Sequence, residues 1–290
     1  MKIVSEQEQK RASYWLSVWR RFKSNKMAFV GLIFIIIITV AAIFTPWIAP
    51  HSYDETNYAH TFEKPSWQFI WGTDDLGRDM FSRNLYAMRN ALLIGFGSQA
   101  IVVVVGVIIG AIAGFRGGTV DSVLMRIVDI MYAFPTFLFN VILVTALGRG
   151  IPIILLAIGI TGWAGMARLV RGMVMSLKNA DFVEAARALG AKEFHIIRKY
   201  ILPNMFGPII VSIAFGIPNA IWMESGLALV GMGVRPPMPS WGNMISAGMG
   251  YIMAFPHMVI FPAILFALTL LAFTYVGDGL RDAMNPKGEA

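Results

Sequence analysis

Six long apolar segments constrain this chain more than any other feature. A helix that crosses the hydrocarbon core of a bilayer needs about 20 predominantly apolar residues. Only 14% of the 290 residues are charged and 57% are hydrophobic, whereas a soluble domain carries about a quarter charged residues. We therefore predict an all-α membrane protein with six transmembrane helices in one domain. The predicted spans are 27–48, 89–114, 122–147, 151–171, 205–230 and 257–279.

The distribution of basic residues orients these spans. If the N-terminus is cytoplasmic, 18 of the 24 Lys and Arg fall in cytoplasmic segments and 6 in external ones. Basic residues concentrate on the cytoplasmic side of membrane proteins, so both termini are predicted to be cytoplasmic. The same pattern explains the formal net charge of +7 without a nucleic-acid partner. The predicted external loops are then 49–88 and 231–256, and the long cytoplasmic loop is 172–204.

The segment before the first span, 1–26, has its own pattern. Trp15, Trp19 and Phe22 recur at helical spacing with basic residues between them. This pattern predicts an amphipathic helix lying in the cytoplasmic membrane interface, although a docking site for a calmodulin-like partner would look similar. The first apolar run is longer than the core of a signal peptide, so we expect an uncleaved span and one six-span domain over 27–290.

The sequence lacks the motifs of the common enzyme classes. It has no cysteine, which excludes disulfides and thiol chemistry, and its four histidines show no H-E-x-x-H spacing. It has neither a G-x-x-x-x-G-K-[ST] phosphate loop nor a G-x-S-x-G motif. We therefore expect no catalytic residue, no bound metal and no cofactor on this chain.

Small residues and prolines mark the predicted spans. Gly106, Gly110 and Gly114 lie on one helical face, which allows close approach of a neighbouring helix. That neighbour could belong to this chain or to another subunit. Prolines inside spans predict kinks, because they remove backbone donors. They are Pro135, Pro208, Pro218 and Pro262.

Polar residues also occur in or near the spans: Asn140, Asn219 and Glu224. Such groups face the protein interior or a water-filled path. They would either join helices or line a route through the membrane.

The local structure of the predicted cytoplasmic loop 172–204 can be inferred from its sequence. The sequence predicts a short helix over about 181–189, a stop at Gly190, a second helical stretch and a proline-marked entry into the fifth span. The first helix would place apolar residues together, with Glu184 and Arg187 beside them. These apolar residues are Phe182, Ala185, Ala186 and Leu189. On its own, the pattern fits either an ordinary amphipathic hairpin or a surface for a soluble partner.

This loop resembles the EAA loop of the membrane subunits of ABC importers. The resemblance rests on Glu184-Ala185-Ala186, on a glycine four residues later, and on a following Leu-Pro pair. In that family the loop contains the coupling helix that docks into the ATPase subunits. One departure is Tyr200, where isoleucine is common. The residues that the resemblance assigns to coupling are Phe182, Glu184, Ala185, Ala186, Leu189, Gly190, Leu202 and Pro203.

Other motifs narrow the resemblance to the C-type, second permease subunit of the oligopeptide, dipeptide and nickel permeases. They are the stretch 72–79 after the first external loop, Trp163 with residues 166–172, the Pro-Ser-Trp-Gly run at 239–242, and residues 277–283 near the C-terminus. Their order and spacing cover nearly the whole chain.

The stretch 72–79 is expected to have a structural role as a turn and helix cap. Thr73 or Asp74 is predicted to satisfy free N–H groups at a helix start, and Arg78 to pair with a nearby aspartate. The family residues in this stretch are Gly72, Thr73, Asp74, Gly77, Arg78 and Asp79. The later external segment, 231–256, could be a gate-like re-entrant segment or a packed loop.

The resemblance implies a type I ABC importer permease fold in a prokaryotic inner membrane. It implies a second, homologous permease subunit, two ATPase subunits that bind ATP and Mg, and an extracytoplasmic substrate-binding protein. The cargo would be peptides, and this chain would form half of the pathway and couple ATPase motion to alternating access. Alternatives are the same family carrying nickel, opines or oligosaccharides, an ATP-independent secondary transporter, and an intramembrane enzyme.

Overall fold

The computed structural model describes residues 14–285. Their regular secondary structure is helical, and they contain no β-strand beyond one isolated bridge between Thr73 and Asp79. The all-α prediction is therefore confirmed. Five helices are long and apolar enough to cross a membrane. They are α2 (Lys26–Ile48), α3 (Met80–Arg116), α6 (Ile151–Leu177), α10 (Phe206–Leu229) and α12 (His257–Met284).

The third predicted span, 122–147, is not one continuous helix. It consists of α4 (Gly118–Ala133) and α5 (Thr136–Leu147), which meet at an angle of 87°. Phe134 is extended, with ψ 133°, immediately before Pro135. A proline disfavours the helical conformation of the residue before it and supplies no N–H of its own. The predicted proline kink is thus a complete break, and the number of spans is six only if the bent pair counts as one.

The second predicted span, 89–114, is shorter than the helix α3 that the structure forms there. At 37 residues and 1.5 Å per residue, α3 is about 55 Å long, well beyond a hydrocarbon core of about 30 Å. The helix begins at Met80 because the carboxylate of Asp79 caps it, accepting a hydrogen bond from the Ser82 N–H at 2.8 Å. The charged first turns of α3 therefore extend outside the membrane.

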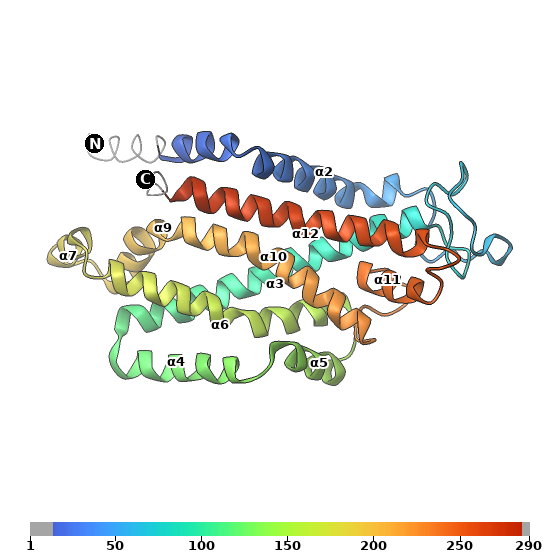
Figure 1. Ribbon diagram of the computed structural model, residues 1–290. Helices are drawn as coiled ribbons and strands as arrows, with labels where there is room; N and C mark the ends of the chain where they lie inside the picture. The colour runs from blue at the N-terminus through green and yellow to red at the C-terminus, as the bar shows by residue number, and fades with distance from the viewer. Residues whose placement is uncertain (1–13, 286–290) are drawn as a thin grey trace.

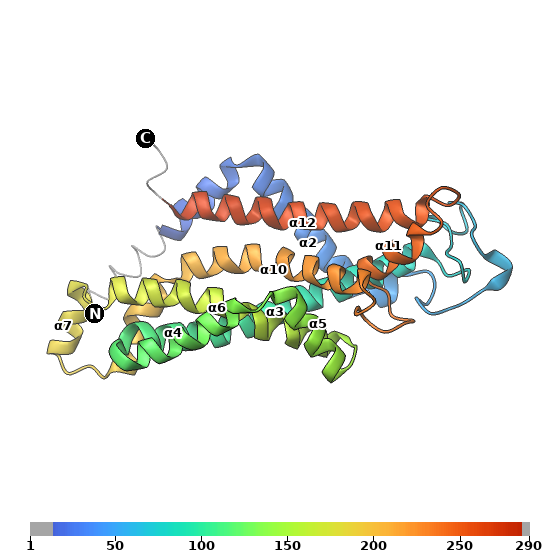
Figure 2. The ribbon, with the colours of Figure 1, turned by 60° about the horizontal axis from the view of Figure 1, so that its bottom comes forward.

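The long helices form one elongated bundle with distinct ends (Figures 1 and 2). The start of α2, the end of α12 and the short helix α7 (Asp181–Ala188) lie at one end, called here the α7 end. The loop of residues 49–79 and the short helix α11 (Trp241–Met249) lie at the other, the α11 end. Because the first and last spans both have their free ends on one side, the arrangement fits an even number of membrane crossings.

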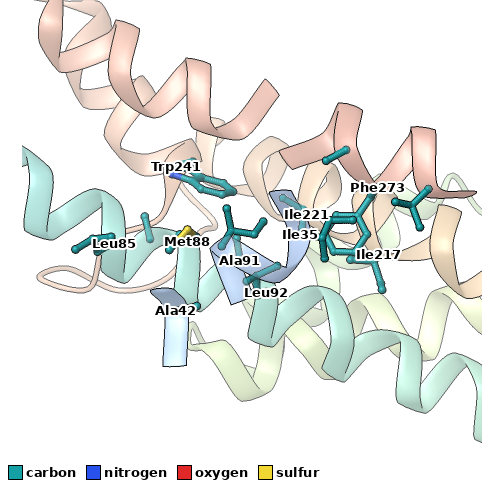
Figure 3. Close-up of a cluster of buried hydrophobic side chains, with 14 of the residues drawn as sticks. Ile35, Ala42, Leu85, Met88, Ala91, Leu92, Ile217, Ile221, Trp241 and Phe273 are labelled. Carbon is teal, nitrogen blue, oxygen red and sulfur yellow. The ribbon is translucent and has the colours of Figure 1, made fainter. Parts of the chain in front are cut away.

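The main apolar cluster joins helices that are far apart in sequence (Figure 3). Ile35 of α2, Met88 of α3, Ile221 of α10 and Phe273 of α12 meet there, and Trp241 of α11 is fully buried against them. Burial of a large aromatic side chain stabilises the packed state by a few kcal/mol. The start of α11 is therefore fixed to the bundle.

The glycine face of α3 packs against α6 within this chain. A Cβ built at Gly106 would overlap Met166, and one built at Gly110 would overlap the Ala167 carbonyl and lie 2.8 Å from the Cβ of Val170. The helices α3 and α6 share the most extensive contact in the described part of the chain. The interpretation as intrachain packing, and not as a subunit contact, is confirmed.

We expect Gly110→Ala to lower the free energy of unfolding by about 1–3 kcal/mol, because a methyl group forces the two backbones apart. The matched control is Gly172→Ala in α6, where an added Cβ meets no atom within 4 Å. That change should be neutral or slightly stabilising, since alanine favours helix over glycine by up to about 1 kcal/mol. Thermal unfolding of the detergent-solubilised protein compares them. Equal midpoints for both variants would contradict the packing role of the glycine face.

A helix is observed over residues 14–24, where the interfacial helix was predicted. Val18 and Phe22 are buried, and Phe22 lies next to Gly279 of α12, whereas Trp15 and Trp19 are more than 40% exposed. The rings of Trp19 and Phe22 stack, with 5.9 Å between their centroids, while Phe22 also packs into the bundle. The position of this helix in the membrane interface stays a prediction. Residues 1–13 of the predicted segment 1–26, and residues 286–290, lie outside the described residues.

Candidate functional site: the α7 loop

The helix α7 (Asp181–Ala188) ends in a Schellman turn at Gly190. The Gly190 N–H donates to the Arg187 carbonyl at 2.9 Å, and the Ala191 N–H donates to the Ala186 carbonyl at 3.0 Å. Gly190 has φ +80°, a conformation that costs a residue with a side chain about 1–2 kcal/mol. No atom lies within 4 Å of a Cβ built there, so the need for glycine comes from the backbone. The predicted helix and glycine stop are confirmed.

Three short helical segments return the chain to the membrane. They are α8 (Glu193–Ile196), the π-helical turn η2 (Ile197–Ile201) and α9 (Leu202–Asn204). Leu202 and Pro203 are partly buried at the base of this return, next to the start of α10. They are therefore separated from the exposed residues of α7.

One face of α7 anchors it to the bundle. Val183 and Ala186 are 0% and 5% exposed. They belong to an apolar cluster with Phe115 at the end of α3, Val174 near the end of α6, and Ile209 at the start of α10. The expectation that Ala186 shares a surface with Phe182 and Leu189 is wrong, because burial of Val183 turns Ala186 inward.

The sequence analysis did not single out Val183. The signal that could have found it is its helical spacing with Ala186, since residues three apart lie on the same side of a helix.

The opposite face of the loop exposes large apolar side chains. Phe182 is 40% exposed, Leu189 89% and Phe194, which was not predicted, 73%. Glu184 and Ala185 are exposed on α7 as well. In Figures 1 and 2, α7 projects beyond the ends of the long helices. Exposed apolar side chains gathered away from the bilayer-spanning part are typical of a protein interaction site.

Ion pairs fix the base of the loop. The guanidinium of Arg171 in α6 pairs with both carboxylate oxygens of Asp121 in α4, at 2.5 and 2.6 Å. Arg168 pairs with Asp129 at 2.5 Å, about one turn from Arg171 along α6 and about two turns from Asp121 along α4. The Lys178 ammonium donates to the Gly114 carbonyl at the end of α3, at 3.2 Å. Bidentate arginine pairs restrict orientation as well as distance, so α3, α4 and α6 are joined where α7 begins.

The stretch 72–79 lies at the other end of the molecule, the α11 end. The carboxylate of Asp74 accepts hydrogen bonds from the N–H groups of Leu76 and Arg78, both at 3.0 Å, and from the Arg78 guanidinium at 2.7 Å. The predicted ion pair of Arg78 is thus confirmed. The cap prediction is wrong, because Asp79 caps α3 while the Thr73 hydroxyl accepts from the Glu63 N–H within the loop.

Arg83 completes this group, and the sequence analysis missed its role. Its Nη1 donates to the Tyr53 carbonyl at 2.7 Å and to the Pro237 carbonyl at 3.4 Å, and its Nε lies 3.4 Å from the Asp74 carboxylate. We call Asp74, Arg78 and Arg83 the arginine clamp. It joins the loop of residues 49–79 to the segment 231–256.

A cavity with a mixed polar and apolar lining lies between the two ends. Its volume is about 490 Å³, and Gln99 of α3, Asn140 of α5, Thr161 of α6 and Asn219 of α10 line it. Asn140 is joined to Thr161 by a hydrogen bond of 3.3 Å. Asn140 therefore joins α5 to α6, as one of the two alternatives for the polar span residues predicted, and it also borders this cavity. That these residues line a route through the membrane stays a prediction. Glu224 is buried and lies 3.5 Å from the Ser225 hydroxyl, outside this lining.

Across residues 14–285, no group of three or more His, Asp or Glu side chains is placed to hold a metal ion.

Two family models match the chain. The model described as "binding-protein-dependent transport system inner membrane component" matches residues 106–288. The model described as "N-terminal TM domain of oligopeptide transport permease C" matches residues 13–65. The first match spans more than half of the chain and includes the whole α7 loop.

Curated relatives match along nearly the full length. The oligopeptide transport system permease protein OppC of Bacillus subtilis (strain 168) is 43% identical, with 96% of this chain and 91% of the relative covered. The dipeptide transport system permease protein DppC of the same strain is 42% identical, covering 95% and 86%. The glutathione transport system permease protein GsiD of Escherichia coli O6:K15:H31 (strain 536 / UPEC) is 39% identical, covering 94% and 90%.

Among solved structures, the fold resembles that of a chain of the MetNI methionine ABC transporter in an inward-facing conformation. The TM-score is 0.58 at 18% identity, over 71% of this chain and 98% of that chain. At this identity the match concerns the fold alone.

Proposed function

The chain belongs to the family of binding-protein-dependent transport system inner membrane components, and on that premise we propose that it is one of two permease subunits of an ATP-driven peptide importer. The observation that carries the proposal is the α7 loop, with its exposed apolar face on a helix whose other face is fixed to α3, α6 and α10. A helix held in this way can receive force from a partner and pass it to the spans.

The proposed complex contains this chain, a second homologous permease subunit, two ATP-binding-cassette ATPase subunits and an extracytoplasmic binding protein. ATP and Mg would bind to the ATPase subunits. The excess of basic residues on the α7 side supports a cytoplasmic position for α7, where ATPase subunits would meet it. Closure of the ATPase pair would move α7 with the joined ends of α3, α4 and α6 as a rigid body and change access to the pathway.

Peptides are the proposed cargo because relatives that match almost the whole chain are named for oligopeptide, dipeptide and glutathione transport. A cargo of nickel, opines or oligosaccharides is the alternative within the same family. An ATP-independent secondary transporter is the alternative outside it, and it would leave the exposed face of α7 without a role.

We expect the tagged chain, purified from its native membrane in mild detergent, to retain P-loop ATPase subunits and a second six-span permease. Reconstituted with the binding protein, the complex should import a labelled peptide only when ATP is supplied inside. Mass spectrometry of the purified complex and uptake into proteoliposomes measure the two outcomes. Uptake that proceeds without any ATPase subunit would reject the importer.

A further inference from the structure

The cavity between the two ends of the molecule has a lining suited to one class of ligand. Gln99 stands about midway along α3 (Met80–Arg116), and Asn219 lies near the middle of α10 (Phe206–Leu229). The cavity therefore lies at about mid-length of both helices, between the α7 end and the α11 end.

The carboxamide of Gln99 faces this cavity without a protein partner. The residue as a whole is only 8% exposed, and its side chain forms no hydrogen bond within residues 14–285. The Gln99 amide atoms are not among the enclosed unpaired polar atoms of that part of the chain, so they are accessible from the cavity. The donor and the acceptor of this carboxamide are therefore available to a molecule that enters the cavity.

The backbone of α10 makes room for this side chain. A Cβ built at Gly216 would overlap the Gln99 carboxamide. Glycine at this position thus lets the amide lie against α10, one turn before Asn219 at the exposed rim of the cavity. The Asn219 side chain likewise has no hydrogen-bond partner among residues 14–285.

The remaining lining excludes several ligand classes. None of the described residues that line the cavity is charged, and the polar ones are amides and hydroxyls, including Thr136 and Ser212. Such a lining offers no counter-charge to a metal ion, a phosphate or a charged side chain. A carboxamide carries both a donor and an acceptor, which matches the N–H and C=O of a peptide bond.

We propose that Gln99 and Asn219 form a transit site that hydrogen-bonds the backbone amide of a peptide while it crosses the membrane. The proposal rests on the peptide cargo proposed above and specifies which part of the cargo is recognised. A site that hydrogen-bonds the backbone amide accepts peptides whose side chains differ. Its uncharged lining holds each peptide weakly enough for release, because a neutral hydrogen bond contributes little net free energy.

The test uses the complete transporter with its binding protein in proteoliposomes, energised with ATP. Maximal uptake rates are measured at saturating binding protein for two probes, trialanine and trialanine N-methylated on the amide nitrogen of its central residue. This methylation removes one of the two peptide N–H groups and leaves the chain length and charge unchanged. For each transporter variant, the uptake rate of trialanine is divided by that of the methylated probe. Any preference of the binding protein for one probe affects this ratio equally in all variants, so a difference between variants reports on the permease.

In the unaltered transporter the ratio of the two rates should differ from one by about two- to tenfold. Gln99→Met, which keeps the length of the side chain and removes the amide, should bring the ratio towards one, and Asn219→Leu should act in the same direction. Thr269→Val in α12 is the matched control, because it removes a buried hydroxyl bonded to the Leu265 carbonyl, outside the cavity lining. It should leave the ratio unchanged.

ATPase activity stimulated by the binding protein verifies that each variant is folded and coupled. If Gln99→Met does not assemble, the ratio measured with Asn219→Leu tests the proposal. A ratio of one in the unaltered transporter, or an unchanged ratio in the coupled variants, would overturn the transit site. Failure of the unaltered complex to import either probe with ATP would instead overturn the proposed peptide importer.

Discussion

Replacing Leu189 by arginine should reduce ATP-dependent uptake to less than about a tenth of normal, while the chain remains folded in the membrane. The side chain is 89% exposed, and substitutions at such positions change stability by less than about 0.5 kcal/mol. A cation at this end of α7 also interacts favourably with the helix dipole. In an ATPase groove, however, the guanidinium would lose its water, and central interface residues contribute about 2 kcal/mol or more.

The matched control is Leu189→Met, which keeps the volume and apolar character of the side chain. Uptake should then stay within about twofold of normal, because volume-conserving apolar exchanges cost little. Uptake is measured beside the amount of chain in the membrane and the amount of ATPase that purifies with it. Normal uptake by Leu189→Arg would show that the exposed face of α7 does not carry the coupling contact.

Replacing Asp74 by alanine should destabilise the α11 end by about 3–5 kcal/mol, enough to prevent recovery of intact protein. The Asp74 carboxylate accepts three hydrogen bonds, from the N–H groups of Leu76 and Arg78 and from the Arg78 guanidinium, and it lies 3.4 Å from the Arg83 Nε as an ion pair. Its side chain is 6% exposed and that of Arg83 8%. Removing one member of a buried pair leaves the other charge without compensation, which is the costly case.

The neighbouring residue provides the control. Asp75 lies 3.8 Å from the Arg78 guanidinium, but its side chain is 37% exposed. Exposed ion pairs contribute about 0–1 kcal/mol, so Asp75→Ala should leave the unfolding midpoint nearly unchanged. Size-exclusion profiles and thermal unfolding of the two variants in detergent compare them. Similar behaviour of Asp74→Ala and Asp75→Ala would mean that the arginine clamp does not hold the loop 49–79 and the segment 231–256 together.

The sequence predicted the helices because hydropathy reports directly on length and apolar character. It placed the first span at 27–48, and the helix covers Lys26–Ile48. It could not show that Pro135 breaks the third span by 87°, because the angle depends on whether neighbouring helices keep the chain straight. It also could not predict the start of α3, since Thr73, Asp74 and Asp79 are all acceptable caps and only the folded loop selects Asp79.

The candidate site was predictable where it depends on local backbone chemistry. The stop at Gly190 follows from the conformational freedom of glycine, and the structure has it. The inward face of α7 was not predictable from its short sequence, because alanines on several sides make the apolar face ambiguous. Contact with Phe115 and Val174 resolves the ambiguity in favour of Val183 and Ala186. Contacts between distant segments, such as Arg83 with Pro237, require the fold itself.

The most direct test of the account is a photocrosslink from the exposed face of α7. p-Benzoylphenylalanine is incorporated in place of Leu189 in the complete transporter, with a reference variant that carries it in place of Met253, a 96% exposed residue at the α11 end. After irradiation, the account predicts an adduct between position 189 and a P-loop ATPase, and none between position 253 and that ATPase. An active complex in which position 189 forms no adduct with an ATPase would contradict the account.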